Sequence, residues 1–284
     1  MECLKPILVG KGYHTKRYVP CGKCAMCMAN LRAEWCGRLM TEFYSSYDAY
    51  FVTYTYDDEH IQETINDNMV PSVHKSHMQK YFKRLRKVLG KESIRYFLTA
   101  EYGSKTLRPH YHALLFFPHK LDFKEKELFD IITNTWAKGL VHFGKVEPAS
   151  VAYTTKYCMK PSAIPEGGNN TFRLMSRFPP LGSTKEYSIE ELGSFRLYGQ
   201  TYKTSSLYRN KLKSSLSDDL QRELKYQSEL AQLQKQQRHF ARWCKQNGYN
   251  VDSIDSMIEY YKVKQITKEN QHMLHMKHIK EEKL

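Results

Sequence analysis

A chain of 284 residues is long enough for one substantial core and an accessory region. Its 44 lysines and arginines outnumber 30 aspartates and glutamates, and the net charge of +14 favours an acidic polymer as partner. No run of about 18 apolar residues occurs, and residues 1–12 have no apolar signal-peptide core, which argues against a membrane protein and a secreted one. The 21 tyrosines could stack on unpaired bases or simply fill the core.

Cysteines mark the N-terminal segment. Cys21, Cys24 and Cys27 form a C-x-x-C-x-x-C motif, and Cys3 lies upstream. Without a secretory signal, metal binding is favoured over disulfides. Tetrahedral Zn²⁺ takes four ligands, so we expect a structural zinc site with Cys3 as the fourth ligand and Cys36 as the alternative. An iron–sulfur cluster is the less favoured interpretation.

Apolar periodicity and turn signals then predict a series of elements. In chain order they are a helix at 28–47, a strand at 50–56, a helix at 72–89, strands at 95–101 and 110–117, a helix at 122–138 and a strand at 140–147. The 72–89 helix has apolar residues at three- and four-residue spacing, and its other face carries Lys80, Lys83, Arg84 and Lys87. From the second element on, the order is β-α-β-β-α-β, which predicts an α+β, ferredoxin-like fold with an antiparallel sheet flanked by helices.

Two histidines stand out in the strand at 110–117. His110 and His112 are separated by one residue, so their side chains lie on one face of the strand. A predicted hairpin brings Glu101, at the end of the preceding strand, across from them. Two imidazoles and a carboxylate suit Mg²⁺ or Mn²⁺. Taken singly, each feature has a plainer explanation, a solvent-facing pair of histidines or a strand-end glutamate.

A helix follows, with Pro148 near its start and Pro161 at its end. Tyr153 and Tyr157 are four residues apart and therefore share one helix face, on which Lys160 also falls. A tyrosine pair of this kind by itself favours core packing. Behind two paired histidines it favours chemistry.

These segments resemble, in order, the three motifs of the HUH endonucleases, the rolling-circle replication initiators and relaxases. The segments are FVTYTY at 51–56, RPHYH at 108–112 and YTTKYCMK at 153–160. The resemblance covers about residues 1–165 and is strongest to the replication initiators of gokushovirus-type Microviridae phages. It implies metal ligands and catalytic residues, respectively His110, His112 and Glu101, and Tyr153, Tyr157 and Lys160.

The implied chemistry suits these residue types. A phenol with a pKa near ~10 is a poor nucleophile at neutral pH, so it needs a nearby cation or base and a polarised phosphate. Attack on DNA would leave a 5′-phosphotyrosine and a free 3′-hydroxyl. Two tyrosines one turn apart would let one site hold one DNA end while cutting the next. We expect Tyr157 to attack first, because it is nearer to Lys160.

The C-terminal part carries fewer signals. Residues 212–284 are predicted to form two helices broken near Asn247-Gly248. The predicted organisation is a Cys-rich metal knuckle at 1–30, a nuclease domain at 31–165, an irregular extension at 166–210 and a basic helical tail at 211–284. The tail is either a solvated face or a clamp for DNA or a partner protein.

The favoured function is a site-specific DNA nicking and joining enzyme that starts rolling-circle replication of a small single-stranded DNA phage. Its expected partners are the single-stranded origin, replicative-form DNA and a host helicase or polymerase, in the host bacterial cytoplasm and without a membrane. A plasmid initiator or mobilisation relaxase is the alternative within the class, and a non-catalytic nucleic-acid-binding zinc protein is the alternative outside it. A histidine-triad hydrolase is disfavoured because Leu114 stands where a further histidine is needed.

Overall fold

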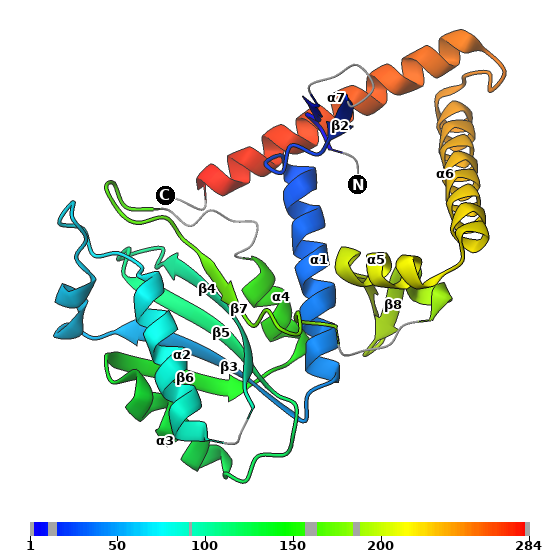
Figure 1. Cartoon of the computed structure of the whole chain (residues 1–284). Helices are drawn as coiled ribbons and strands as arrows, with labels where there is room; N and C mark the ends of the chain where they lie inside the picture. Colours follow the sequence, from blue (N-terminus) through cyan, green and yellow to red (C-terminus); the bar gives the residue numbers. More distant parts are fainter. Residues whose placement is uncertain (1–2, 11–15, 91–92, 157–163, 184–187, 282–284) are drawn as a thin grey trace. The chain divides into compact units, whose positions relative to one another are not determined.

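The computed structural model describes the chain except residues 1–2, 11–15, 91–92, 157–163, 184–187 and 282–284 (Figure 1). It divides into two compact units. Ala29–Tyr208 form the first, here called the sheet unit. Met1–Met28 and Arg209–Glu282 form the second, the terminal unit.

The sheet unit is built on a five-stranded antiparallel sheet of order β6-β3-β5-β4-β7. The strands are β3 (Asp48–Tyr56), β4 (Arg95–Tyr102), β5 (Pro109–Phe117), β6 (Gly139–Lys145) and β7 (Arg173–Met175). Helix α2 (Lys75–Leu89) links β3 to β4, and α3 (Glu125–Trp136) links β5 to β6. The predicted α+β fold class and the β-α-β-β-α-β order are therefore confirmed, with element ends shifted by a few residues.

One face of the sheet packs against α2 and α3 (Figure 1). Helix α2 buries its apolar stripe of Met78, Tyr81, Phe82, Leu85 and Leu89, as its spacing predicts, and ends at Gly90 with φ 63°. Aromatic rings fill the interior of this layer, and buried phenols find partners among themselves. The hydroxyls of Tyr54 and Tyr81, for example, lie 2.8 Å apart.

The other face of the sheet is covered by α1 (Ala25–Tyr44) and α4 (Pro148–Lys156). The Trp35 ring of α1 packs on Phe97 of β4, with centroids 4.9 Å apart. Tyr153 of α4 contacts Phe51 of β3 edge-on at 6.0 Å. Since side chains alternate along each strand, this face is made of the residues that the aromatic core leaves out.

The segment after α4 supplies the edge of the sheet. β7 pairs with β4, and the chain beyond it is tied to α1 and β4 through a buried ion pair of Arg95 with Glu42. The Arg95 guanidinium also donates to the carbonyl of Pro179 at 2.9 Å, and the amide of Gly182 donates to Glu42 at 2.7 Å. The predicted domain boundary at residue 165 stays a prediction, but a part of the 166–210 segment belongs to the sheet.

Shorter elements complete the sheet unit. They are two 3-10 helices, η2 (His60–Thr64) and η3 (Ile189–Leu192), and a hairpin of β8 (Ser194–Leu197) and β9 (Gln200–Lys203). Helix α5 (Ser206–Ser215) follows and crosses into the terminal unit.

The terminal unit holds a small hairpin of β1 (Ile7–Val9) and β2 (Arg17–Val19) and two long helices, α6 (Asp218–Asn247) and α7 (Ile254–Glu281). α6 ends where the predicted break lies, at Gly248 with φ 73°. The rings of Phe240 and Trp243 contact Tyr260 and join the two helices. Within the described residues, no helix combines the length and apolarity needed to cross a membrane.

Candidate functional site

Two threonines of β3 anchor the two histidines of β5. In the sheet register Thr53 lies opposite His112 and Thr55 opposite His110. Each threonine Oγ1 is 2.9 Å from the Nδ1 atom of its histidine. An imidazole that donates its Nδ1 proton to such an oxygen presents the Nε2 lone pair, which is the form that binds a metal ion. The structure thus orients both rings in the same way.

Glu101 joins this pair from β4. It lies opposite His110 in the register, and its Oε1 atom is 2.5 Å from Nε2 of His112. Glu101 and His112 are buried, at 9% and 7% exposure. A buried carboxylate requires a compensating positive charge or hydrogen bonds, and two imidazole nitrogens beside it complete a donor set that fits Mg²⁺ or Mn²⁺. The residues present therefore fit the metal that the sequence predicts.

The electrostatics favour the uncharged form of His110. Burial lowers the pKa of His110 below its usual value, and the neighbouring His112 lowers it further. A neutral imidazole is the ligating species, because protonation removes its lone pair.

A glycine leaves room for His110. A Cβ atom on Gly103 would lie 2.9 Å from the His110 Nε2 atom, closer than such contacts allow. The sequence marks Gly103 only as a turn residue. In the structure its lack of a side chain also keeps the Nε2 atom of His110 accessible.

Tyr111, between the two histidines, points to the opposite face of the sheet. Its hydroxyl accepts a hydrogen bond from the backbone N–H of His74 at 2.8 Å and lies 3.1 Å from the Tyr56 hydroxyl. A polar phenol is accommodated at this core position because these partners satisfy it.

Tyr153 lies beside His112. The two rings meet edge-on, with centroids 5.6 Å apart, while the Tyr153 side chain remains 45% exposed. Arg32 of α1 holds this helix by donating to the carbonyl of Ala152 at 3.3 Å. Tyr153 is thus both next to the histidines and open to a ligand from solvent. Tyr157 and Lys160 lie outside the described residues.

Sequence reasoning passed over the threonines of this face. Thr53 and Thr55 stand inside the FVTYTY motif, but their contacts depend on the register of β3 with β5. Thr99 lies opposite His112 on the other side, and among the described residues its buried hydroxyl makes no hydrogen bond. Alternation from Glu101 along β4 was the signal that could have indicated Thr99.

The four predicted cysteines come together in the terminal unit. The sulfur atoms of Cys3, Cys21, Cys24 and Cys27 all lie within 4.8 Å of one another. Cys3 and Cys24 are separated by 3.8 Å and Cys21 and Cys27 by 4.0 Å. Four sulfurs at about 2.3 Å from a tetrahedral zinc would be about 3.8 Å apart, whereas a disulfide needs about 2.0 Å. This cluster could bind a metal ion, and Cys3 rather than Cys36 is its fourth member.

Backbone amides donate to the sulfurs of this cluster. Cys21 N–H donates to Cys3 at 3.2 Å, and Cys24 N–H donates to Cys21 at 3.3 Å. Burial raises the pKa of Cys24, but amide and thiol donors including Leu4 N–H outweigh it and bring the pKa to about 6. Burial raises the pKa of Cys27 to about 12. The cluster therefore favours a thiolate at Cys24 before any cation is bound.

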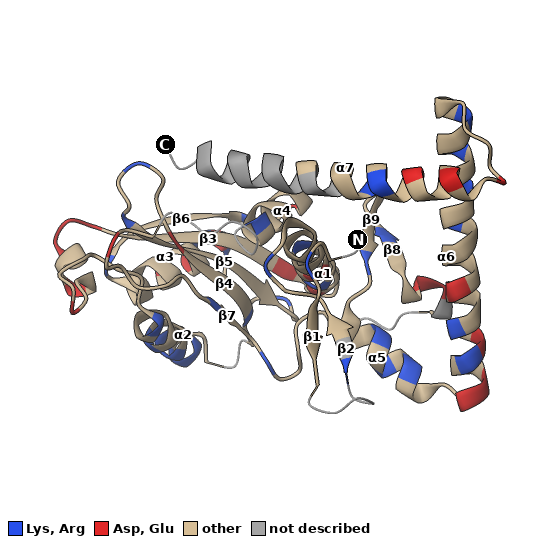
Figure 2. Ribbon diagram, turned by 90° about the horizontal axis from the view of Figure 1, so that it is seen from above, with Lys and Arg blue, Asp and Glu red and all other residues tan. Residues whose placement is uncertain are grey.

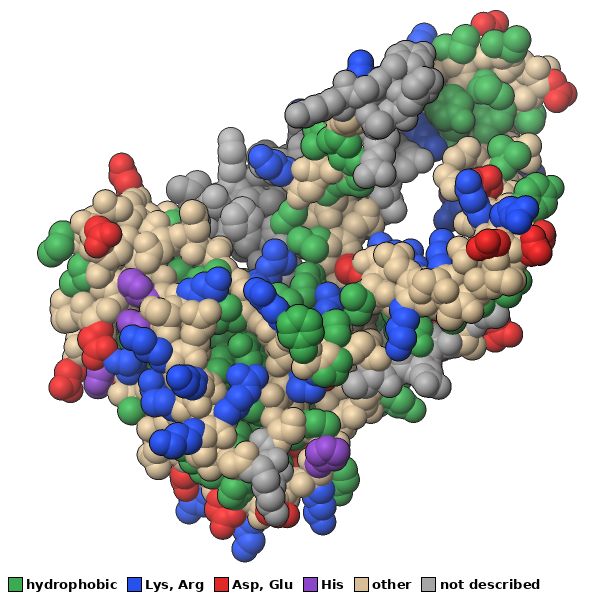
Figure 3. All heavy atoms as spheres, in the orientation of Figure 1, with side chains coloured by type: hydrophobic (Ala, Val, Ile, Leu, Met, Phe, Trp, Pro, Cys, Tyr) green, Lys and Arg blue, Asp and Glu red, His purple; other side chains and the backbone are tan. Residues whose placement is uncertain are grey.

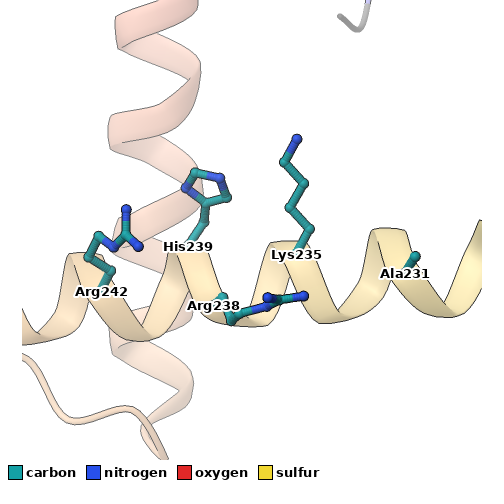
Figure 4. Close-up of a pocket in the computed structure, with 5 residues that line it drawn as sticks. All are labelled: Ala231, Lys235, Arg238, His239 and Arg242. Atoms are coloured by element: carbon teal, nitrogen blue, oxygen red, sulfur yellow. The ribbon is translucent and has the colours of Figure 1, made fainter. Parts of the chain in front are cut away.

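A basic hollow lies along α6 in the terminal unit (Figure 4). Its volume is about 350 Å³, and Lys235, Arg238, His239 and Arg242 line it together with Ala231. In Figure 4 the side chains of Lys235, His239 and Arg242 rise from the same side of the helix. The cations come from one helix, so this hollow is a basic surface rather than an enclosed site.

The comparisons with known proteins agree with the motif order. The family model of the replication-associated protein ORF2 matches residues 49–162. The replication-associated protein ORF2 of Spiroplasma virus 4 is 35% identical over 168 residues, which are 54% of this chain and 51% of that protein. The replication-associated protein VP4 of Bdellovibrio phage phiMH2K is 30% identical over 228 residues, which are 71% of this chain and 70% of that protein.

The extent of these matches differs. The chain spans about half the length of the spiroplasma virus relative. Among solved structures, the N-terminal nuclease domain of minute virus of mice non-structural protein-1 gives a TM-score of 0.22 at 10% identity, covering 64% of this chain and 82% of that chain. A likeness this weak carries no argument.

Proposed function

The chain belongs to the family of replication-associated proteins represented by ORF2, and from this premise we propose that it starts rolling-circle replication of a small single-stranded DNA phage genome. It would act as a site-specific, metal-dependent endonuclease and ligase. The observation that carries the proposal is the juxtaposition of Tyr153 with His112 and Glu101 on one face of the sheet.

The site residues divide the work. Glu101, His110 and His112 would hold Mg²⁺ or Mn²⁺, with Thr53 and Thr55 fixing the orientation of the imidazoles. When bound, the ion supplies Lewis acidity toward the scissile phosphate. Tyr153 lies where its phenol oxygen can approach a phosphate seated on this face, because its ring is beside His112 and half open to solvent.

The covalent step exchanges one phosphate ester for another. The phenol oxygen forms a bond to phosphorus, and the bond from phosphorus to the 3′ oxygen breaks. The phenol proton leaves to solvent, and the departing 3′ oxygen takes up a proton to become a hydroxyl. The phosphotyrosine keeps the ester bond, so a later attack by a 3′-hydroxyl rejoins DNA in the reverse reaction.

Two further assignments belong to the proposal. Tyr153 and Tyr157 both act as nucleophiles, with Tyr157 first and Lys160 stabilising the charge at its phenol or at the phosphate. The four-cysteine cluster holds a structural Zn²⁺, supported by sulfur separations close to those of a tetrahedral site.

The family relationship supports the setting as well. We place the activity in the host bacterial cytoplasm, on the single-stranded origin and replicative-form DNA, with a host helicase or polymerase as partner. A non-catalytic nucleic-acid-binding protein would need no exposed tyrosine beside two oriented histidines.

Trapping the covalent intermediate tests this function. The full chain is incubated with Mn²⁺ and single-stranded oligonucleotides tiled across its own genome, and adducts are separated on a denaturing gel. We expect one oligonucleotide to give an adduct, with the DNA on Tyr157 or Tyr153 by mass spectrometry. The matched control is Tyr47→Phe, since Tyr47 is 61% exposed in the same unit and, among the described residues, makes no contact with the histidines.

The single variants Tyr153→Phe and Tyr157→Phe then separate the two roles. An adduct on Tyr153 alone in the unmodified protein would reverse the proposed order of attack. No adduct with any oligonucleotide would overturn the enzyme assignment and favour the non-catalytic alternative.

A further inference from the structure

The outer face of α2 is strongly cationic and plays no part in the proposed cleavage site. Residues 75–89 contain no aspartate or glutamate. All the lysines and arginines of the helix are exposed: Lys75, Lys80, Lys83, Arg84, Arg86 and Lys87. Figure 3 shows blue side chains gathered over this helix, and Figure 2 shows the same helix without red residues.

These cations cover the whole solvent side of the helix. With about 100° between successive residues, three groups follow from the core stripe outward. Lys83 and Lys87 lie at the centre of the exposed arc, Lys75 and Arg86 lie on one flank, and Lys80 and Arg84 lie on the other. The apolar residues Tyr81 and Leu85 point the opposite way, into the core.

The fold itself does not account for this arrangement. Among the described residues, none of the four lysines takes part in an ion pair, whereas Arg84 donates to the carbonyl of Thr135 at 3.1 Å and Arg86 lies over the Tyr96 ring. Like charges three and four residues apart destabilise a helix, as does a cation in its first turn. The neighbouring helix α3 mixes both signs in its first turns, with Glu125, Lys126 and Glu127 exposed.

The position of α2 separates this face from the histidines. α2 packs on the sheet face that carries Tyr54 and Tyr111, while His110, His112 and Tyr153 belong to the opposite face. A nucleic acid bound along α2 is therefore a second contact, different from a strand at the histidines.

We propose that the outer face of α2 is a second DNA-binding surface, which takes the phosphate backbone of duplex DNA. An α-helix fits the major groove, which is about 12 Å wide, and a helix inserted there meets a row of phosphates on each flank. Cations on both flanks of α2 match two rows, whereas a single strand offers one. Lysines contact phosphates without reading sequence, so this surface holds duplex beside the site rather than selecting the origin. That role rests on the proposed function, but the binding itself does not.

The test removes three charges from α2 and three from a matched surface. Lys80→Gln, Lys83→Gln and Lys87→Gln are combined in the full chain. The control combines Lys120→Gln, Lys126→Gln and Lys145→Gln, which are exposed lysines of the same unit near the acidic start of α3. Binding to a short duplex of arbitrary sequence, and to a single strand of equal length, is followed by fluorescence anisotropy at several salt concentrations, without divalent metal.

The α2 triple variant should lower the slope of log affinity against log salt by about 2.7 for the duplex, at roughly 0.9 per lost phosphate contact. The control should leave the slope nearly unchanged. Thermal unfolding verifies the fold first, and Lys83→Gln alone, with an expected decrease of roughly 0.9, replaces the triple variant if the latter does not fold.

Other outcomes overturn the inference. Equal losses in both triple variants would mean that total charge, not α2, determines binding. An equal loss for single-stranded DNA would make the partner a single strand. An unchanged duplex slope would leave α2 as a solvated face. Since no cleavage is measured, formation of the tyrosine adduct with an unchanged slope would remove this inference and keep the proposed function.

Discussion

The two faces of the central sheet are made from alternate residues of the same strands, yet they differ in chemistry. On the α2 and α3 face, Tyr54, Tyr111 and Trp136 are completely buried, and the tyrosine hydroxyls are paired. On the α1 and α4 face, His112 and Glu101 form a polar pair at 2.5 Å. One residue along β5 thus separates a core position from a ligand position.

The difference shows how this fold can hold a reactive group rigidly. The histidines stand on a strand whose other side is fixed by a dense aromatic layer, so their backbone cannot shift without disturbing that core. Substitutions on the two faces should therefore have separable effects, on activity for one face and on stability for the other.

The largest effect is expected on the ligand face. His110→Ala combined with His112→Ala should decrease nicking by at least about 10³-fold, since metal polarisation contributes several kcal/mol. The temperature of unfolding should change little, because the ring nitrogens contact threonines and a glutamate, not the core. Adduct formation and thermal unfolding measure the two quantities. Full cleavage by this variant in the presence of a chelator would contradict the metal assignment.

On the core face, Trp136→Ala should destabilise the sheet unit by about 3–5 kcal/mol, the cost of a large buried cavity. The Trp136 ring packs on Tyr54 at 5.3 Å and on Tyr56 at 5.2 Å. Denaturant unfolding gives the free energy, and adduct formation well below the transition should stay close to normal per folded molecule. A stable variant that had lost cleavage would show that the two faces are not separable.

A smaller effect should come from the second layer of the ligand face. Thr53→Val keeps the shape of the side chain and removes the oxygen 2.9 Å from the His112 Nδ1 atom. We expect a metal affinity lower by about 10–100-fold, measured by Mn²⁺ titration of activity or by calorimetry. Thr201→Val, at an exposed position of β9, is the control and should bind Mn²⁺ normally. Equal affinities for both variants would mean that Thr53 does not orient the ring.

The smallest effect concerns His77, at the α2 side of the sheet. Burial lowers the pKa of His77 to about 4, and the nearby His74 lowers it further, while its Nδ1 atom lies 2.8 Å from the Tyr56 hydroxyl. The unfolded chain takes up this proton near pH 6.5 and the folded protein only near 4, so stability should fall as pH falls between these values. His77→Gln should make the decrease shallower in urea unfolding at several pH values. The same slope in both proteins would show that His77 titrates normally.

Local periodicity explains which features could be predicted from the sequence. A period of two placed His110 and His112 on one face and Tyr111 on the other, as found in β5. A helical period gave the buried stripe of α2, and the glycine after α6 gave its end. These features depend on backbone geometry over a few residues, so the chain encodes them locally.

Only the tertiary structure decided how distant segments meet. Cys3 and Cys36 are equally plausible ligands from spacing, and folding of the N-terminal segment brings Cys3 to the other three sulfurs. The anchoring of His112 by Thr53 spans 59 residues and follows from the register of two strands. β7 adds to the sheet edge through three residues, too few for a sequence pattern to reveal. Such contacts depend on which chain conformations bury the most surface together, and no single segment contains that information.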